Sequence, residues 1–273
     1  MQLIDTHAHI QEPEFKDDIA DVLLRAQDAG VESIVVPGVD LETSHAAARL
    51  AREHASLFAG AGFHPHEASR LDAHALEQIE ALLGQPEVVA VGEIGLDYFH
   101  MHSPRQAQVE VLEQMLVLAG RYSLPVSVHC RDAWDDMASI LLPWAQRMAP
   151  RYSGEPMGVL HYFSSSLEEA RRYAEHGFVI SIHTSVTHPK SVSLREVAAG
   201  LPLDKLVVET DSPYGAPQAF RGKRNEPSYV VEAASAIAAL HSVSLDDVAT
   251  QTTANARRLF RLPVATSAQA GAV

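Results

Sequence analysis

The sequence predicts an α/β fold, a (β/α)8 TIM barrel with a metal site at the C-terminal rim of its strands. Short β-rich runs alternate with longer amphipathic runs, which is the rhythm of a parallel sheet with crossover helices. The 273 residues are 47% hydrophobic, enough for one large core. Metal-capable side chains follow several of the β-rich runs, where catalytic residues collect in such barrels.

We expect eight strands, each a short run rich in apolar or β-branched residues. They are Gln2–Thr6, Ser33–Pro37, Leu57–Gly62, Val88–Glu93, Pro125–His129, Met157–His161, Phe178–Ile182 and Leu206–Glu209. A Rossmann-type sheet is the alternative, but no Gly-x-Gly-x-x-Gly motif follows an early strand.

Amphipathic runs between these strands predict the helices. They are Phe15–Ala29, Glu42–His54, Ala73–Leu83, Arg105–Tyr122, Ala133–Met148, Leu167–His176 and Ser191–Ala199, followed by Ser228–Leu240 and Leu245–Phe260. Gly30 and Gly177 suit the position just after a helix. Ser103 before Pro104 suggests a helix cap, and Pro150–Pro156 suggests a loop before the sixth strand.

Neither an interdomain linker nor an internal repeat is evident, so we expect one domain over residues 1–262 and a disordered tail over 263–273. The formal net charge of −14 does not favour nucleic-acid binding by the whole surface. The single cysteine, Cys130, excludes an internal disulfide and fits a reducing cytosol. Because neither a signal pattern nor a membrane-spanning apolar run is evident, we expect a cytoplasmic protein without membrane contact or an obligate protein partner.

His7 and His9 follow the first strand at a spacing of two. Side chains alternate along a strand, so both imidazoles are expected to point the same way and form half of a metal site. Asp5 shares their parity and is expected one layer deeper, hydrogen-bonded to a ligand ring. The alternative is a chance His-x-His near a frayed end.

Four further metal-capable residues lie at or just after other strand ends: Glu93, His129, His161 and Asp211. With His7 and His9 they offer four imidazoles and two carboxylates, which suit two divalent ions. No lysine lies between Lys16 and Lys190, so Glu93 must bridge the ions if a protein group does. Structural alternatives remain: Glu93 as a cap or ion-pair partner, His161 as a packed core residue, and Asp211 as an N-cap.

A second set of residues is expected at the same rim. His64 and His66 follow the third strand and could bind a phosphate or a further metal, or form a polar loop. Arg131 is placed to clamp an anionic oxygen, or could pair with Asp132 or Asp135. The basic cluster of Arg221, Lys223 and Arg224 follows the eighth strand. It favours an anionic substrate near the mouth, with a solvated loop as the alternative.

Seven sequence blocks together resemble the TatD family of metal-dependent deoxyribonucleases, within the amidohydrolase-like barrels. The resemblance runs from about Leu3 to Phe260. The blocks are Asp5–His9, Gly62–His66, Gly92–Tyr98, Pro125–Arg131, His161–Ser164, Glu209–Tyr214 and Arg221–Pro227. The chain departs from the family pattern at Ser165 and in the loop Ile182–Thr187, where glycines are usual.

The resemblance implies one metal at His7, His9, Glu93 and Asp211, and another at Glu93, His129 and His161. It implies hydrolysis of nucleic-acid ester bonds, typically DNA trimmed from its 3′ end with magnesium. Some members look able to remove D-amino acids from tRNA. Histidine-rich coordination favours a transition metal instead, so the ions could be magnesium, zinc or manganese.

We therefore expect a divalent-metal-dependent deoxyribonuclease, a 3′-5′ exonuclease that uses metal-activated water. Asp211 is expected to take the proton, and Arg131, with His64 or His66, to hold the phosphate. An ester or amide hydrolase of the same class, such as a D-aminoacyl-tRNA deacylase, is the alternative enzyme, since the ligand set cannot separate these reactions. A barrel recruited only for binding is the other, although unpaired buried carboxylates would be costly to keep.

Overall fold

Eight parallel strands form one sheet, in chain order, in the computed structural model, which describes residues 1–263. They are β1 (Leu3–Asp5), β2 (Val31–Val36), β3 (Leu57–Ala61), β4 (Val88–Asp97), β5 (Val126–Arg131), β6 (Gly158–Leu160), β7 (Phe178–His183) and β8 (Leu206–Glu209). The Thr6 N–H donates to the Val208 carbonyl over 3.1 Å and joins the first strand to the last. The eight expected strands and the barrel are therefore confirmed, while the tail expected over residues 263–273 lies outside the described residues from residue 264 onward.

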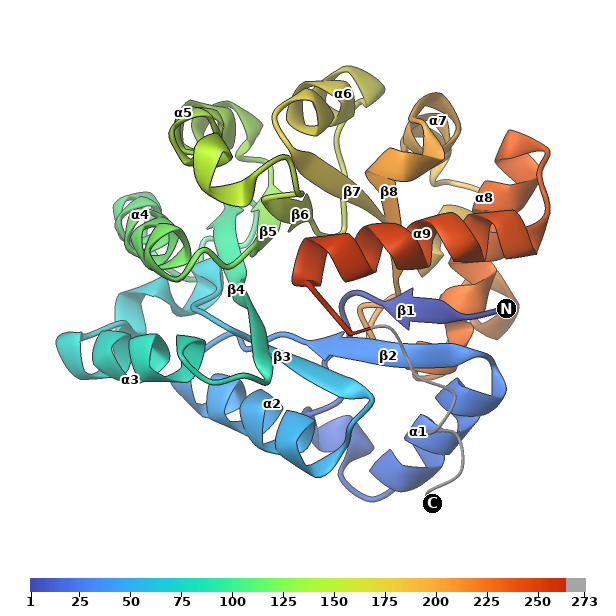
Figure 1. Ribbon diagram of the computed structural model, residues 1–273, viewed down its shortest axis with the longest axis horizontal. Helices are drawn as coiled ribbons and strands as arrows, with labels where there is room; N and C mark the ends of the chain where they lie inside the picture. Colours follow the sequence, from blue (N-terminus) through green and yellow to red (C-terminus); the bar gives the residue numbers. More distant parts are fainter. Residues whose placement is uncertain (264–273) are drawn as a thin grey trace.

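Helices surround the strands, as Figure 1 shows. They are α1 (Ile19–Asp28), α2 (Leu41–Glu53), α3 (Ala73–Leu83), α4 (Arg105–Tyr122), α5 (Trp134–Tyr152), α6 (Leu167–Glu175), α7 (Val192–Gly200), α8 (Val230–His241) and α9 (Leu245–Phe260). Gly30 and Gly177 follow α1 and α6 with φ of 86° each, the left-handed conformation expected after a helix.

Three elements differ from the prediction by more than two residues at one end. β4 continues past Glu93 to Asp97, because residues 94–97 pair with residues 128–131 of β5. α1 begins at Ile19, after a short 3₁₀ turn over Pro13–Phe15. α5 continues into the expected loop, Pro150–Pro156, and ends at Tyr152, whose hydroxyl donates to the Leu124 carbonyl.

Ser103 does not cap α4, so that prediction is wrong. Its hydroxyl donates to the His66 carbonyl over 2.8 Å and accepts the Ser69 N–H over 3.0 Å. The side chain therefore joins the segment before α4 to the short helix η2 (Pro65–Arg70) on the loop after β3.

The barrel interior is closed at one end by α9. Apolar residues of the strands, among them Ile4, Val159 and Val207, form a cluster with Leu259 and Phe260 of this helix. Figure 1 shows α9 lying across this end of the barrel, beside β1, and the helix contacts both β1 and β8. Because this cluster fills the N-terminal part of the interior, polar side chains can gather only at the opposite, C-terminal end.

Side chains that point into the barrel alternate along each strand up to its C-terminal end. Val159 of β6 lies in the interior cluster, and His161 follows two residues later. Val207 of β8 likewise lies two residues before Glu209, and Asp211 follows just beyond the end of this strand. Side chains two residues apart share a face, so the strands deliver imidazoles and carboxylates to one rim.

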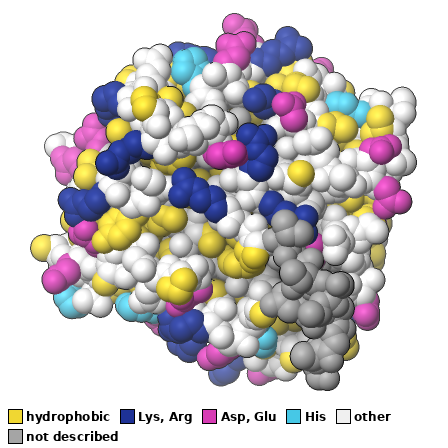
Figure 2. Space-filling model, in the orientation of Figure 1, with side chains coloured by type: hydrophobic (Ala, Val, Ile, Leu, Met, Phe, Trp, Pro, Cys, Tyr) yellow, Lys and Arg dark blue, Asp and Glu magenta, His cyan; other side chains and the backbone are white. Residues whose placement is uncertain are grey.

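The outer surface is mixed in charge. Figure 2, in the same orientation, shows basic and acidic side chains interspersed among the described residues of this face.

No single helix within residues 1–263 has the length and apolar composition to cross a membrane. The pair Pro227–His241 and Leu245–Phe260 passes that test only jointly, with a bend of 114° between its members.

Candidate metal centre

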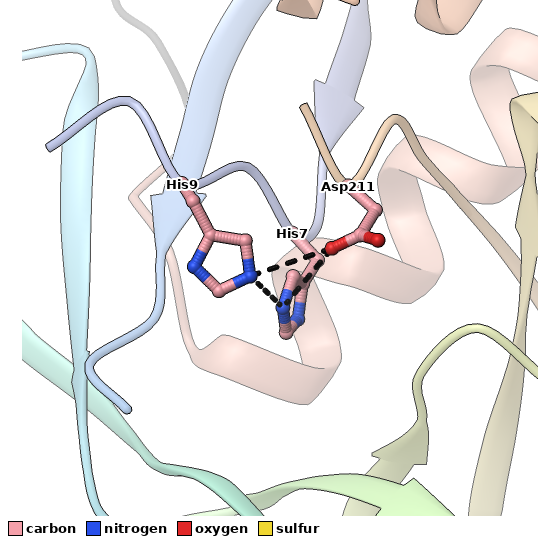
Figure 3. A group of neighbouring side chains, drawn as sticks. All are labelled: His7, His9 and Asp211. Atoms are coloured by element: carbon pink, nitrogen blue, oxygen red, sulfur yellow. Dashed lines mark hydrogen bonds and ion pairs between the residues drawn. The ribbon is translucent and has the colours of Figure 1, made fainter. Parts of the chain in front are cut away.

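His7, His9 and Asp211 form the first group at the rim, and Figure 3 shows both imidazoles turned toward the carboxylate. Asp211 Oδ1 lies 3.4 Å from His9 Nε2 and 3.9 Å from His7 Nε2. The two Nε2 atoms are 3.2 Å apart. All three residues are buried, so these ring nitrogens and this carboxylate oxygen face one another in a region largely shielded from solvent.

The two histidines reach this position by a route that strand alternation does not describe. β1 ends at Asp5, so His7 and His9 lie in irregular backbone beyond it. Hydrogen bonds from the Ala8 N–H to the Val35 carbonyl and from the His9 N–H to the Ser212 carbonyl hold that backbone between its neighbours. The two imidazoles therefore lie close together, as expected. Hydrogen bonds to neighbouring segments, and not strand alternation, hold them in this position.

Glu93 divides its two carboxylate oxygens between this group and a second one. Oε2 lies 3.3 Å from His7 Nε2 and 3.6 Å from His9 Nε2. Oε1 lies near three other imidazoles, at 3.1 Å from His129 Nδ1, 3.4 Å from His64 Nε2 and 3.6 Å from His161 Nε2. The carboxylate thus stands between two sets of potential ligands. His64, expected to hold phosphate or a further metal, lies within the second set.

Further polar groups lie behind the imidazoles. Asp97 Oδ2 is 3.3 Å from His129 Nε2, and Glu209 Oε1 is 3.0 Å from His161 Nδ1. Ser127 Oγ is 3.3 Å from His7 Nδ1. Such partners fix the orientation of metal-binding imidazoles. The sequence analysis did not select Glu209 or Ser127, although each shares strand parity with a residue that it did select.

Asp5 does not contact a ligand ring, so the expectation that it orients one is wrong. Its carboxyl accepts hydrogen bonds from the Thr210 N–H at 3.0 Å and the Thr210 hydroxyl at 2.6 Å. Burial raises the pKa of Asp5 to about 8. Asp5 therefore supports the backbone just before Asp211, whose φ of 56° and N–H bond to the His7 carbonyl set its side chain in the group.

The charges at this rim fit bound cations. Within residues 1–263, every ion-pair partner of Glu93 and Asp211 is a histidine. Although burial acts to raise the pKa of Asp211, the neighbouring imidazoles lower it to about 2. Burial lowers the pKa of His161 and the charges of Glu209 and Glu93 raise it, to about 10. A buried carboxylate needs a positive partner, and imidazole nitrogens with carboxylate oxygens are common ligands of divalent metals.

A cavity of about 850 Å³ opens over both groups. Three of its lining side chains are large, aromatic and exposed: Phe99 at 58%, Tyr214 at 53% and Tyr162 at 37%. The sequence analysis did not select these residues, because single aromatic residues in loops carry no periodic signal. Apolar rings at the mouth give the cavity flat surfaces against which a planar ligand could stack.

Two of the other expected site residues line the same cavity. The Arg131 guanidinium lies 4.1 Å from the centre of the Phe99 ring, and no ion pair joins it to Asp132 or Asp135 in the described chain. His66 Nε2 lies 2.8 Å from Asp97 Oδ2. Arg131 is therefore free to meet an anion, whereas His66 already has a carboxylate partner.

The basic cluster after β8 lies apart from the cavity lining. Arg224 forms two hydrogen bonds to Asp18, at 2.6 and 2.8 Å, and its guanidinium stacks 4.5 Å from the centre of the Phe15 ring. Arg221 and Lys223 are exposed. Arg224 is thus committed to an internal pair, and the other two side chains face solvent.

Comparison with known proteins gives a consistent result. The family described as TatD related DNase matches residues 4–261. The chain is 38% identical over 260 residues to the uncharacterized metal-dependent hydrolase YabD of Bacillus subtilis, covering 95% of this chain and 99% of that protein. It is 34% identical over 263 residues to the 3′-5′ ssDNA/RNA exonuclease TatD of Escherichia coli, covering 94% and 98%.

A solved structure agrees with these sequence matches. The crystal structure of YjjV, a TatD homologue from Escherichia coli, superimposes with a TM-score of 0.87 at 34% identity, covering 96% of this chain and 98% of that one. The likeness thus extends over almost the whole length of both chains, including every strand that carries a rim residue.

Proposed function

This chain belongs to the family of TatD related DNases and is a metal-dependent hydrolase, and from that premise we propose that it is a two-metal nuclease. Its proposed reaction is the shortening of single-stranded DNA from a free 3′ end. The observation that carries the proposal is the position of Glu93, whose two oxygens face separate groups of imidazoles beneath one cavity. A carboxylate in that position suits a bridge between two ions.

The residues divide into two proposed ligand sets that share Glu93. His7, His9 and Asp211 would hold one ion, and His129 and His161 the other, with His64 close to the second set. Divalent ions held there would activate water and polarise a phosphoryl oxygen. The ions could be magnesium, manganese or zinc, because the imidazoles suit zinc or manganese and the family resemblance favours magnesium.

Asp211 is our candidate for the proton acceptor. Its carboxyl is ionised at neutral pH, as an ordinary aspartate is, so an oxygen is available to accept a proton from the attacking water. It lines the cavity, whereas Glu209 is fully buried behind His161. Proton transfer to a positioned carboxylate typically contributes about 10²–10⁴-fold to a rate.

The cavity wall supports a nucleic-acid substrate. Arg131 offers a planar set of donors to a phosphate, with His64 and His66 beside it on the same wall. Phe99 and Tyr214 offer rings on which unpaired bases can stack. We propose Arg221 and Lys223 as outer phosphate contacts, which a weaker salt dependence of binding in their neutral variants would support.

A pocket at the rim of a barrel, unlike a long groove, also favours a chain end over an internal bond, because an end can enter without threading. The name of the Escherichia coli relative, 3′-5′ ssDNA/RNA exonuclease TatD, supports the proposed 3′-5′ direction. Single strands avoid the free energy of unpairing a duplex. The proposed substrate is therefore a single strand with a free 3′ end, of DNA and secondarily of RNA.

The test is to incubate the purified protein with DNA labelled at its 5′ end, in magnesium, manganese or zinc, with and without a chelator. A ladder of progressively shorter labelled products that the chelator abolishes is the expected result. Internal cuts from the outset, or no cleavage in any metal, would contradict the proposal. Efficient deacylation of a D-aminoacyl-tRNA without DNA cleavage would assign the metal centre to the alternative chemistry.

A further inference from the structure

A third group of potential metal ligands lies at the edge of the same cavity, outside the two sets that share Glu93. It contains His66 of η2, Asp97 at the end of β4 and His100 in the turn that follows. Asp97 Oδ2 lies 2.8 Å from His66 Nε2 and 2.8 Å from His100 Nδ1. The His102 ring centre is 4.4 Å from that of His66, so a further imidazole adjoins the group.

The backbone around this group is held firmly. Asp97 Oδ1 accepts the N–H groups of Phe99 and His100, at 2.9 and 2.8 Å, which closes the turn. Gln108 accepts the Asp97 N–H and donates to the Asp97 and Ser103 carbonyls. The turn that carries His100 and His102 is therefore positioned before any ligand binds, as metal sites require.

The Asp97 carboxylate has more nitrogen neighbours than acceptor sites. An ionised carboxylate has about four acceptor sites. Two backbone N–H groups occupy Asp97 Oδ1, and three ring nitrogens lie within 3.3 Å of Oδ2: those of His66, His100 and His129. Orienting His129 would need only one of these contacts. Several imidazole nitrogens close to one carboxylate oxygen are also the arrangement of side chains that bind a metal ion together.

We propose that His66, Asp97 and His100, with His102 as a fourth ligand, bind a further divalent transition-metal ion, with zinc the best fit. The ligating atoms of the first three residues lie within 4.8 Å of one another. Three imidazoles with one carboxylate give the nitrogen-rich, four-ligand set that zinc takes in proteins. The His66 and His100 side chains are 23% and 37% exposed, so an ion can enter from the cavity.

The position of this site suggests its use. His66 and His100 line the cavity together with Arg131 and Phe99. A bound cation would add positive charge to that wall, beside the guanidinium that we assign to phosphate. The site would therefore help to hold an anionic chain, without belonging to the two ligand sets around Glu93.

The experiment measures zinc per chain by mass spectrometry, after equilibration with buffered zinc and desalting. The wild type is compared with a His100→Ala/His102→Ala double variant and with a His74→Ala control on α3. All three histidines are exposed, so folding should be retained, and circular dichroism checks it. We expect the double variant to hold one zinc fewer than the wild type and the control to hold the same number.

Equal zinc in the wild type and the double variant would overturn the proposal. If the double variant is unfolded, the single His100→Ala variant replaces it, and an unchanged zinc content there overturns the proposal equally. A His9→Ala variant separates this site from the proposed two-metal centre. If the two-metal centre does not bind zinc, the wild type will hold fewer zinc ions in total. The double variant will still hold one zinc fewer than the wild type, because His100 and His102 belong to the separate site.

Discussion

The carboxylates of this protein lie in two regions that differ in the cations they face. At the C-terminal rim, Glu93 and Asp211 are surrounded by imidazoles. On the barrel exterior, carboxylates pair with arginines: Glu32 of β2 with Arg257 of α9 at 2.7 Å, and Asp18 with Arg224 at 2.6 Å. Both arrangements join segments far apart in the chain, but only the second uses a side chain that is always charged.

The carboxylates on the exterior are neutralised by arginines of the protein, whereas those at the rim can be neutralised by a bound metal ion. A guanidinium keeps its proton at any ordinary pH, so an arginine pair is neutral as built. An imidazole nitrogen can exchange its proton for a metal ion, so a bound cation can take the place of the protons around the rim carboxylates. The comparison therefore predicts that changes at the rim alter catalysis and metal content, whereas changes at the arginine pairs alter only stability.

Among these changes, the substitution Glu93→Gln should have the largest effect on turnover and metal content. It keeps the shape of the side chain and removes the charge between the two imidazole groups, so turnover should fall by about 100-fold or more. Metal content should fall with it. Glu32→Gln makes the same change beside an arginine and should leave turnover unchanged. Equal losses in both variants, or a wild-type rate with wild-type metal content in Glu93→Gln, would contradict the assignment.

Removal of metal should lower the thermal stability of the wild type. A ligand present at 100 times its dissociation constant stabilises the folded state by about 2.7 kcal/mol, which corresponds to roughly 5–10 °C in Tm for a chain of this size. Calorimetry with and without chelator measures the shift, and added metal should reverse it. Glu32→Gln should keep the chelator effect, while Glu93→Gln should reduce it. If chelator does not change the Tm of the wild type, the rim carboxylates are neutralised by the protein itself without bound ions.

Phe99→Ala tests a contribution at the cavity mouth that involves neither the carboxylate–imidazole contacts nor the carboxylate–arginine pairs. Base stacking on an aromatic ring is worth about 1–3 kcal/mol, so KM for single-stranded DNA should rise by roughly tenfold with little change in kcat. Val117→Ala on α4, 60% exposed and outside the cavity lining, is the control. A fall in kcat at unchanged KM would show instead that Phe99 acts by supporting Arg131.

Arg224→Ala should have the smallest effect, on stability alone. Exposed ion pairs contribute about 0.2–1 kcal/mol, so the free energy of unfolding should fall by that amount at neutral pH. Hydrogen bonding to Arg224 lowers the pKa of Asp18, so this contribution is present above the unfolded pKa of Asp18 and is lost as the pH falls through the folded value. Urea unfolding at neutral and acidic pH measures it. A difference between wild type and variant that persists at low pH would contradict the role of this pair.

The sequence by itself predicted most of the fold and most of the rim. The alternation of β-rich and amphipathic runs depends only on local periodicity, and it located all eight strands. Their position at the ends of predicted strands also placed His129, His161 and Asp211 at one rim, because the C-terminal ends of barrel strands meet there. The cytoplasmic location and the roles of individual residues stay predictions.

The tertiary structure decided which groups meet. Asp5 supports Thr210 instead of an imidazole, and Arg224 pairs with Asp18 across 206 positions of the chain. Neither contact has a signal within the local sequence, because the paths of the connecting loops set it. The same holds for the turn after β4 that brings His100 to Asp97, since β4 continues past its expected end through pairing with β5. Periodicity records which face a residue occupies, whereas its partner depends on the register of neighbouring strands and on loop geometry, which only the folded chain determines.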